Sequence, residues 1–272
     1  IRGVYGNRYY TRFYPGGTDA AHVIGFINRA DTPVTGVERT LDFYLRGSPG
    51  WSVREVNGSR REIRHFRVRD VAARHGYHVE LTLDSGVQRV VERELDAIMG
   101  DYAPQSAVAI VTEAGSGAVL ALASRPTFDP NRFWEYDLEN DLRNRAIADI
   151  YEPGSTFKII TAAGFINEGI GDRDTLFDCS IPSVTHRNRR VVLPRDTRPR
   201  DVLPFHEVIK KSSNRGAALA GFELGEQRFH RYCQAFGFGR ETGIELNGEE
   251  GGILHPIDRW DHYTLSRLAI GY

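Results

Sequence analysis

The chain reads RNRAIADIYEPGSTFKIITAAGFI from Arg143 to Ile166, and this stretch carries its most informative motif. Pro153 and Gly154 form a sharp entry, after which an apolar helix is predicted from about Ser155. Ser155 and Lys158 are three residues apart, so both side chains fall on one helical face. A lysine kept neutral by burial can take the proton of a serine hydroxyl, and a helix N-terminus favours developing negative charge. The spacing therefore predicts a serine nucleophile with a lysine base.

A second motif, Ser212-Ser213-Asn214, follows later in the chain. Thirteen serines and three lysines in 272 residues make about 0.14 chance matches to S-x-x-K, whereas S-x-N is expected about 0.5 times by chance. The plain alternatives are a surface serine with a solvated lysine for the first motif and a helix cap or turn for the second. The functional interpretation of the second motif is a hydroxyl for proton relay and an amide that holds a peptide.

The remaining pattern predicts an α+β fold. Residues 78–83 alternate like a strand, and Asp84 is a cap for a helix that closes near Gly100. Two apolar strands, 106–112 and 118–124, read as a hairpin. Residues 172–204 are loop-like with a hairpin around 189–193, and helices are predicted over 208–224 and 227–236. The first 77 residues, rich in Gly, Arg and aromatics, indicate a small and mostly β module, and we place the domain boundary after Tyr77.

Composition narrows the function classes. The formal net charge is −1, which disfavours nucleic-acid binding. The sequence contains no run of about eighteen apolar residues and no signal peptide. Cys179 and Cys233 form neither a disulfide framework nor a metal knuckle, and one bridge or two buried thiols both remain open. The nine histidines lack metal-ligand spacing, so we expect no metal and no organic cofactor.

Taken together, the motifs resemble those of the class B penicillin-binding proteins. Arg143 to Lys158 is similar to the active-site segment of that family, and Lys211 to Asn214 (KSSN) to its second motif. Three later segments also resemble family landmarks: Phe236 to Gly239, Thr242 to Glu245 (TGIE) and Ala269 to Tyr272 (AIGY). The family's pedestal domain is resembled at Tyr14-Pro15, Ala21 to Gly25, Gly36 to Glu38 and Leu45 to Gly50.

The resemblance implies a fold and a reaction. We expect a transpeptidase domain over residues 78–272, an antiparallel sheet flanked by helices like that of serine β-lactamases, preceded by a pedestal domain over residues 1–77. The implied activity is peptidoglycan D,D-transpeptidation through an acyl-serine. The implied catalytic residues are Ser155 as nucleophile, Lys158 as base, Ser212 as proton relay and Asn214 as holder of the acyl-side amide. Gly154, Thr156 and Ser213 are implied as substrate contacts.

Partners and location follow from the same resemblance. The implied ligands are stem peptides ending in D-Ala–D-Ala and β-lactam antibiotics. The implied partner is a membrane glycosyltransferase of the shape, elongation, division and sporulation family, and the implied location is the bacterial inner membrane with the catalytic domain on its periplasmic side. The R-N-R-A lead-in and the S-S-N motif resemble division-type enzymes more than elongation-type ones.

One family motif is missing. No lysine follows Lys211, so a Lys-Ser/Thr-Gly sequence cannot occur before Tyr272. We expect that motif to lie beyond this residue, and the membrane anchor to precede Ile1. The alternatives that remain are an elongation-type transpeptidase, a serine β-lactamase, a β-lactam sensor and a catalytically degenerate division scaffold.

Overall fold

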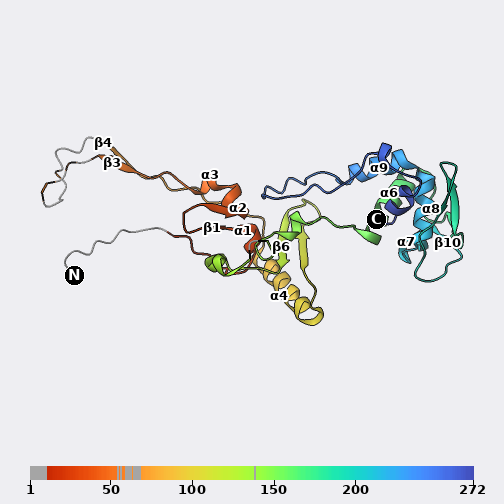
Figure 1. The fold of residues 1–272 in the computed structure, drawn as a ribbon, viewed down its shortest axis with the longest axis horizontal. Coiled ribbons are helices and arrows are strands. Elements are labelled where there is room, and N and C mark those ends of the chain that lie inside the picture. Colours follow the sequence, from red (N-terminus) through yellow and green to blue (C-terminus); the bar gives the residue numbers. More distant parts are fainter. Residues whose placement is uncertain (1–10, 54, 56, 59–62, 64–68, 138) are drawn as a thin grey trace. The chain divides into compact units, whose positions relative to one another are not determined.

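The computed structural model describes residues 11–53, 55, 57–58, 63, 69–137 and 139–272 (Figure 1). The chain forms two compact units. The N-terminal unit comprises Ile1–Asp149 and Gly243–Glu249, and the C-terminal unit comprises Ile150–Thr242 and Glu250–Tyr272. This division by contacts falls after Asp149, and the domain boundary placed after Tyr77 stays a prediction.

The N-terminal unit contains mostly short elements around one long helix and one hairpin. In chain order they are α1 (Ala21–Ile24), β1 (Phe26–Ile27), β2 (Pro33–Thr35), α2 (Gly36–Thr40), α3 (Asp42–Leu45), β3 (Trp51–Val53), β4 (Arg69–Val71), α4 (Ser85–Tyr102), β5 (Ala107–Thr112), β6 (Val119–Arg125), the 3₁₀ helix η2 (Pro130–Glu135) and α5 (Arg145–Ala148). The aromatic cluster of this unit centres on Phe26 and Phe128, both fully buried.

Helix α4 starts where the sequence predicts, because Asp84 accepts hydrogen bonds from the backbone N–H groups of Gly86 and Val87. Its buried face is more polar than its apolar spacing suggests. Gln88 pairs with the backbone of Leu122 in β6 through both atoms of its amide, at 2.9 and 3.0 Å. The side chain thus satisfies backbone groups of β6 that no third strand among the described residues pairs with, and it binds α4 to the β5–β6 hairpin.

The predicted strand over residues 78–83 is wrong. These residues form no β-ladder in the structure. The segment runs beside the start of β6 and bonds to it through the Thr82 hydroxyl, 2.6 Å from the Val119 carbonyl oxygen, and through the Asp84 N–H, 2.9 Å from that of Leu120. Alternation alone cannot specify a strand, because a ladder also needs a neighbour with free backbone groups in register.

The C-terminal unit is mainly helical. Its elements are the 3₁₀ helix η3 (Gly154–Phe157), α6 (Lys158–Asn167), β7 (Leu176–Asp178), β8 (Ser183–His186), β9 (Arg189–Val192), β10 (Val202–Pro204), α7 (Phe205–Lys210), α8 (Asn214–Leu224), α9 (Glu226–Ala235), the 3₁₀ helix η4 (Ile257–Arg259) and α10 (Thr264–Leu268). The predicted hairpin is β8–β9, and strands β7 and β10 form a second antiparallel pair within the stretch expected to be loop.

Small residues let the helices of this unit approach closely. A Cβ atom on Gly164 of α6 would lie 2.5 Å from Leu224 of α8, and one on Gly221 would lie 2.8 Å from the Cβ of Ala269. Helix α8 therefore serves as the central element against which α6 and α10 pack. The single helix predicted over 208–224 is divided in two at Ser212, whose φ is 53°.

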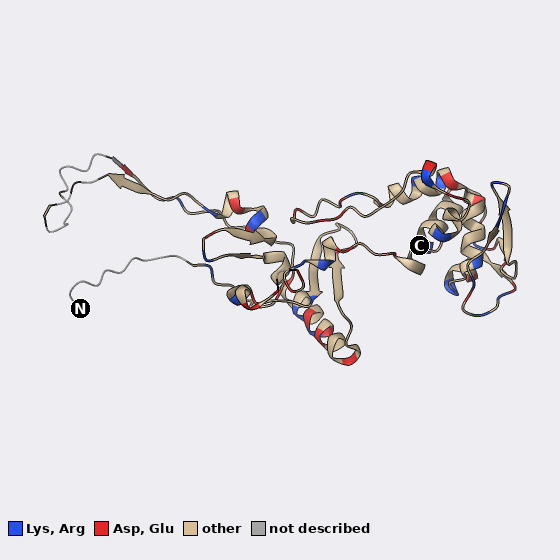
Figure 2. Ribbon diagram, viewed as in Figure 1, with Lys and Arg blue, Asp and Glu red and all other residues tan. Residues whose placement is uncertain are grey.

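The α+β class is confirmed, with one difference in the strands. Those that the structure describes form five separate antiparallel pairs and no larger sheet. In the described part of the chain, no helix combines the length and the apolar character needed to cross a bilayer. Figure 2 shows acidic and basic residues interspersed along the described helices of both units, in keeping with the near-neutral net charge.

Candidate active site

Ser155 lies on a tight turn that leads into an apolar helix. Gly154 has a φ of 60°, a conformation open to glycine at little cost, and it begins the 3₁₀ helix η3. Helix α6 follows directly from Lys158, three residues later than predicted. Side chains three apart eclipse in a 3₁₀ turn, so Ser155 and Lys158 share one side of it. Ser155 and Thr156 are exposed, and the Thr156 hydroxyl donates to the Pro153 carbonyl at 2.8 Å.

Ala269 and Gly271 hold the turn at Ser155 in place. The N–H of Gly154 donates to the carbonyl oxygen of Gly271 at 3.0 Å. Gly271 has a φ of 89°, and a Cβ there would lie 2.1 Å from the Gly154 carbonyl oxygen. The buried Thr161 hydroxyl donates to the Ala269 carbonyl at 3.0 Å and fixes the same segment to α6. The close approach therefore requires glycine at position 271.

Lys158 is almost completely buried, with 2% of its surface exposed. Its Nζ lies 2.8 Å from the carbonyl oxygen of Ser212, 2.9 Å from the Ser212 hydroxyl and 2.7 Å from Oδ1 of Asn214. Three acceptors match the three protons of an ammonium group. In the neutral amine the lone pair is free to accept, and the Ser212 hydroxyl is then able to donate to it.

Burial lowers the pKa of Lys158 to about 8, although the Asp196 carboxylate opposes this shift. An ordinary lysine has a pKa near 10.4 and is almost fully protonated at neutral pH. The lowered value gives a useful fraction of neutral amine near pH 7. The side chain therefore has the property required of a general base.

Ser212 occupies a backbone position that normally favours glycine. The N–H of Ser212 bonds to the Ile209 carbonyl and that of Ser213 to the Val208 carbonyl, at 3.0 and 2.8 Å. This is the Schellman ending of a helix, whose left-handed residue is usually glycine. A serine here accepts conformational strain of about 1 kcal/mol. Its hydroxyl, held against Lys158, is the group that glycine would lack.

The hydroxyl of Ser213 bonds to Asp196 and to the first turn of α8. Its side chain is 1% exposed, and its hydroxyl donates to Asp196 Oδ2 at 2.7 Å while accepting from the Gly216 N–H at 3.1 Å. This arrangement caps α8. Substrate contact by Ser213 stays a prediction, and its buried hydroxyl favours the capping role.

The described hydrogen bonds include none between Ser155 and Lys158. The two motifs nevertheless meet, because Lys158 binds both ends of the Ser212–Asn214 turn. Hydrogen bonds of a catalytic pair often tighten only when substrate is bound. The arrangement thus combines an exposed serine with a buried, partly neutral amine three residues further along the chain.

The match to a known domain decides the family. The penicillin binding protein transpeptidase domain matches residues 107–272, more than half of the chain. The chain belongs to the penicillin-binding protein transpeptidase family. The resemblance drawn from the two motifs is thereby confirmed.

Relatives from this family cover nearly all of the chain. It is 34% identical to stage V sporulation protein D of Bacillus subtilis. The match covers 100% of this chain and 42% of that protein. It is 29% identical to the peptidoglycan D,D-transpeptidase FtsI of Escherichia coli, covering 96% of this chain and 43% of FtsI. Penicillin-binding protein 3 of Mycobacterium tuberculosis, solved in complex with aztreonam, matches with a TM-score of 0.81 and 32% identity over 95% of this chain and 54% of that one. The chain therefore spans about two-fifths of the length of stage V sporulation protein D and of FtsI.

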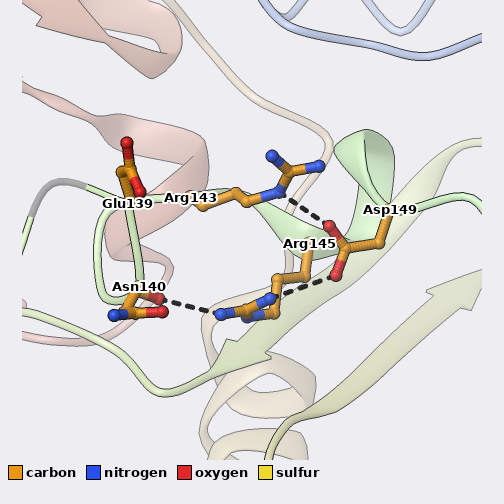
Figure 3. A pocket seen from close by; sticks show the side chains of 5 residues that line it. All are labelled: Glu139, Asn140, Arg143, Arg145 and Asp149. Carbon is orange, nitrogen blue, oxygen red and sulfur yellow. Dashed lines mark hydrogen bonds and ion pairs between the residues drawn. The ribbon is translucent and has the colours of Figure 1, made fainter.

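A pocket in the N-terminal unit involves the start of the quoted motif segment. It has a volume of about 590 Å³ and is lined by Glu139, Asn140, Arg143, Arg145 and Asp149. Figure 3 shows Arg143 and Arg145 pointing at the two oxygens of Asp149, at 2.7 and 3.2 Å. Partial burial raises the pKa of Asp149, yet these two bonds hold it below its ordinary value. Arg143, Arg145 and Asp149 are thus paired with one another, and no described serine, cysteine, histidine or lysine lines the pocket.

Metal-ligating side chains and the two cysteines were the other candidates for a site. Among residues 11–53, 55, 57–58, 63, 69–137 and 139–272, no three His, Cys, Asp or Glu side chains form a group able to hold a metal ion. Cys179 and Cys233 are both buried free thiols. Of the two interpretations that the sequence left open, one disulfide bridge or two buried thiols, the structure has the second.

Two residues that contact these turns, Asp196 and Gly271, carry no marked signal in the sequence. Asp196 contacts the second motif from a loop sixteen residues upstream of Ser212, and nothing in its local pattern marks it. Gly271 belongs to the AIGY landmark, but its contact with Gly154 is not visible in the sequence. Both act through tertiary contacts, which spacing in a single sequence does not reveal.

Proposed function

We propose that this chain forms part of a peptidoglycan D,D-transpeptidase that cross-links stem peptides through an acyl-serine at Ser155. The observation that carries the proposal is the buried amine of Lys158, bonded to Ser212 and Asn214 and three residues from an exposed serine. Membership of the family and the relative named peptidoglycan D,D-transpeptidase support it.

In the first step Oγ of Ser155 attacks the carbonyl carbon of the D-Ala–D-Ala bond. Neutral Lys158 takes the hydroxyl proton as the new C–O bond forms. The first N–H groups of a helical turn have no acceptor within it, so the backbone of η3 is suited to bind the developing oxyanion. The amide of Asn214 has a second N–H with which to hold the acyl-side peptide.

In the second step the C–N bond breaks and the terminal D-Ala leaves as an amine. The proton taken up by Lys158 reaches that nitrogen through the Ser212 hydroxyl, which lies 2.9 Å from the lysine amine. The amine of a neighbouring stem peptide then attacks the ester. The peptide cross-link forms, and the hydroxyl of Ser155 is regenerated. A β-lactam acylates the same oxygen by opening its ring, and nothing leaves.

The biological setting is part of the proposal. Relatives named FtsI and stage V sporulation protein D support a role in septal wall synthesis. A location at the bacterial inner membrane with the catalytic domain outside the cytoplasm fits that substrate. A membrane glycosyltransferase of the shape, elongation, division and sporulation family is the proposed partner. An elongation role is the alternative within the class.

Intact mass after incubation with a fluorescent penicillin tests the reaction. We would use the complete product of the gene that encodes these residues, its Ser155→Ala variant and a Ser106→Ala control at another exposed serine. We expect one adduct with the full mass of the antibiotic on the wild type and on Ser106→Ala, and none on Ser155→Ala.

Other outcomes select among the alternatives. A folded wild type without an adduct would contradict the proposal and favour a division scaffold. An adduct without transfer to an acceptor amine would indicate a β-lactam sensor. Rapid hydrolysis of the adduct would indicate a β-lactamase. Synthetic stem peptides with a free acceptor amine distinguish these cases when the cross-linked product is measured by mass.

A further inference from the structure

A carboxylate outside both motifs anchors the second one. Asp196 is half-buried in the loop between β9 and β10. Its Oδ2 accepts from the Ser213 hydroxyl at 2.7 Å, and its Oδ1 accepts from the N–H groups of Asn214 and, at 3.2 Å, Arg215. Hydrogen bonds to an ionised carboxylate are roughly twice as strong as neutral ones, and a negative charge is favoured at the start of a helix such as α8. Asp196 therefore fixes the backbone where the turn becomes helix.

The neighbouring residue fixes the side chain of Asn214. The carbonyl oxygen of Arg195 accepts from Asn214 Nδ2 at 2.8 Å. An amide whose nitrogen is held on one side must present its oxygen to the other, and Oδ1 indeed lies 2.7 Å from Lys158 Nζ. Two consecutive loop residues thus determine both the position and the orientation of Asn214.

The same carboxylate acts on Lys158 through space. The groups that bond the amine, on Ser212 and Asn214, are neutral. Among the described residues, Asp196 is the charged group that shifts the pKa of Lys158, and it opposes the lowering of that pKa by burial. Its negative charge favours the protonated amine.

We propose that Asp196 is a positioning residue of the active site, which holds the Ser212–Asn214 turn against Lys158 so that the two motifs act as one unit. This inference rests on the proposed acyl-serine function. Asp196 is set apart from the catalytic residues because its contacts go to the turn and not to the position of the substrate.

The test is the pH profile of acylation by a fluorescent penicillin between pH 6 and 9, in the complete gene product. Asp196→Asn keeps the shape and removes the charge. Asp201→Asn is the matched control, since Asp201 is an exposed aspartate five residues further along the same segment. For Asp196→Asn we expect the plateau rate to fall about 10- to 100-fold, because small displacements of catalytic groups are costly. We also expect the acidic limb of the profile, where the rate rises as Lys158 loses its proton, to move to lower pH by about half a pH unit to one pH unit.

Two results would overturn the inference. One is an Asp196→Asn profile that coincides with the wild type. The other is a lower rate with the acidic limb unmoved, which would reduce Asp196 to a structural cap. The Asp201→Asn profile should match the wild type. A wild type that forms no adduct contradicts the proposed function instead, so the two failures are distinguishable.

A second variant serves if Asp196→Asn does not fold. Asp196→Glu keeps the charge but lengthens the side chain by one methylene. We expect it to lower the plateau at least about tenfold while the acidic limb stays at the wild-type pH. A wild-type plateau in this variant would overturn the inference.

Discussion

Nζ of Lys158 lies 2.7 Å from Oδ1 of Asn214, across 56 residues of sequence. The contact joins the first turn of α6 to the first turn of α8 and buries the lysine. Because the amine is enclosed and bonded by neutral groups, its proton is held less tightly than in water. The proton affinity of Lys158 thus depends on a contact between two helices.

Acylation is expected to follow the ionisation of Lys158. With a pKa of about 8, only the neutral fraction acts as base, and this fraction grows about tenfold per pH unit below that value. The logarithm of the second-order acylation rate should therefore rise with unit slope from pH 6 and level off above about pH 8. Stopped-flow measurement with a fluorescent penicillin checks this. A flat profile over pH 6 to 9 would contradict the role of Lys158 as base.

The free energy of unfolding should also depend on pH through the ionisation of Lys158. The pKa of Lys158 is lowered from 10.5 in the unfolded chain to about 8 in the fold, so between these values the unfolded chain binds a proton that the folded chain does not. The free energy of unfolding contributed by this group therefore rises with pH across that window. Relative to Lys158→Met, the wild type should gain about 1 to 2 kcal/mol between pH 8 and 9.5 in urea titrations. Parallel curves for the two proteins would exclude the shift.

A charge at position 214 should suppress acylation near neutral pH. Asn214→Asp places a carboxylate 2.7 Å from the amine and removes the donor to the Arg195 carbonyl. The pKa of Lys158 should rise, and the acidic limb should move up by about one unit or more. Asn140→Asp adds the same charge at an exposed position of the N-terminal unit and should leave the limb in place. An unchanged limb in Asn214→Asp would mean that the contact is absent in solution.

Two substitutions at Ser212 separate backbone strain from chemistry. Both remove the hydroxyl, but glycine tolerates the φ of 53° and alanine does not. We expect Ser212→Gly to be more stable than Ser212→Ala by about 1 kcal/mol in thermal unfolding. Both should acylate about 10- to 1,000-fold more slowly, in the range for loss of a proton-transfer group. If Ser212→Gly acylates at the wild-type rate, the hydroxyl has no role in relay.

A methyl group at position 271 should disturb the serine turn. In Gly271→Ala the Cβ would lie 2.1 Å from the Gly154 carbonyl oxygen, so the turn that carries Ser155 must move. We expect acylation to fall by about tenfold or more. Gly169→Ala is the control, because Gly169 also has a positive φ, 64°, but nothing lies within 4 Å of its Cβ position. Equal losses in both variants would assign the effect to backbone strain alone.

Local patterns in the sequence were sufficient for much of the fold. The cap at Asp84, the β5–β6 hairpin and helix α9 involve residues close in the chain, whose spacing and turn chemistry are visible directly. The strand predicted over residues 78–83 is wrong because a strand also depends on the free backbone groups of a partner. The break at Ser212 was missed because a serine in a left-handed conformation carries no local signal, unlike glycine.

Residue types at short spacing were enough to indicate the family, an apolar helix close to Ser155 and Lys158, and the identity of the second motif. The burial of Lys158, the contacts of its amine with Ser212 and Asn214, and the contacts of Asp196 and Gly271 with the two turns are visible only in the folded protein. Desolvation and hydrogen bonding depend on which groups the fold brings together, and residues far apart in the chain supply those groups. A lysine's pKa is therefore a property of its packed surroundings and not of its neighbours in the chain.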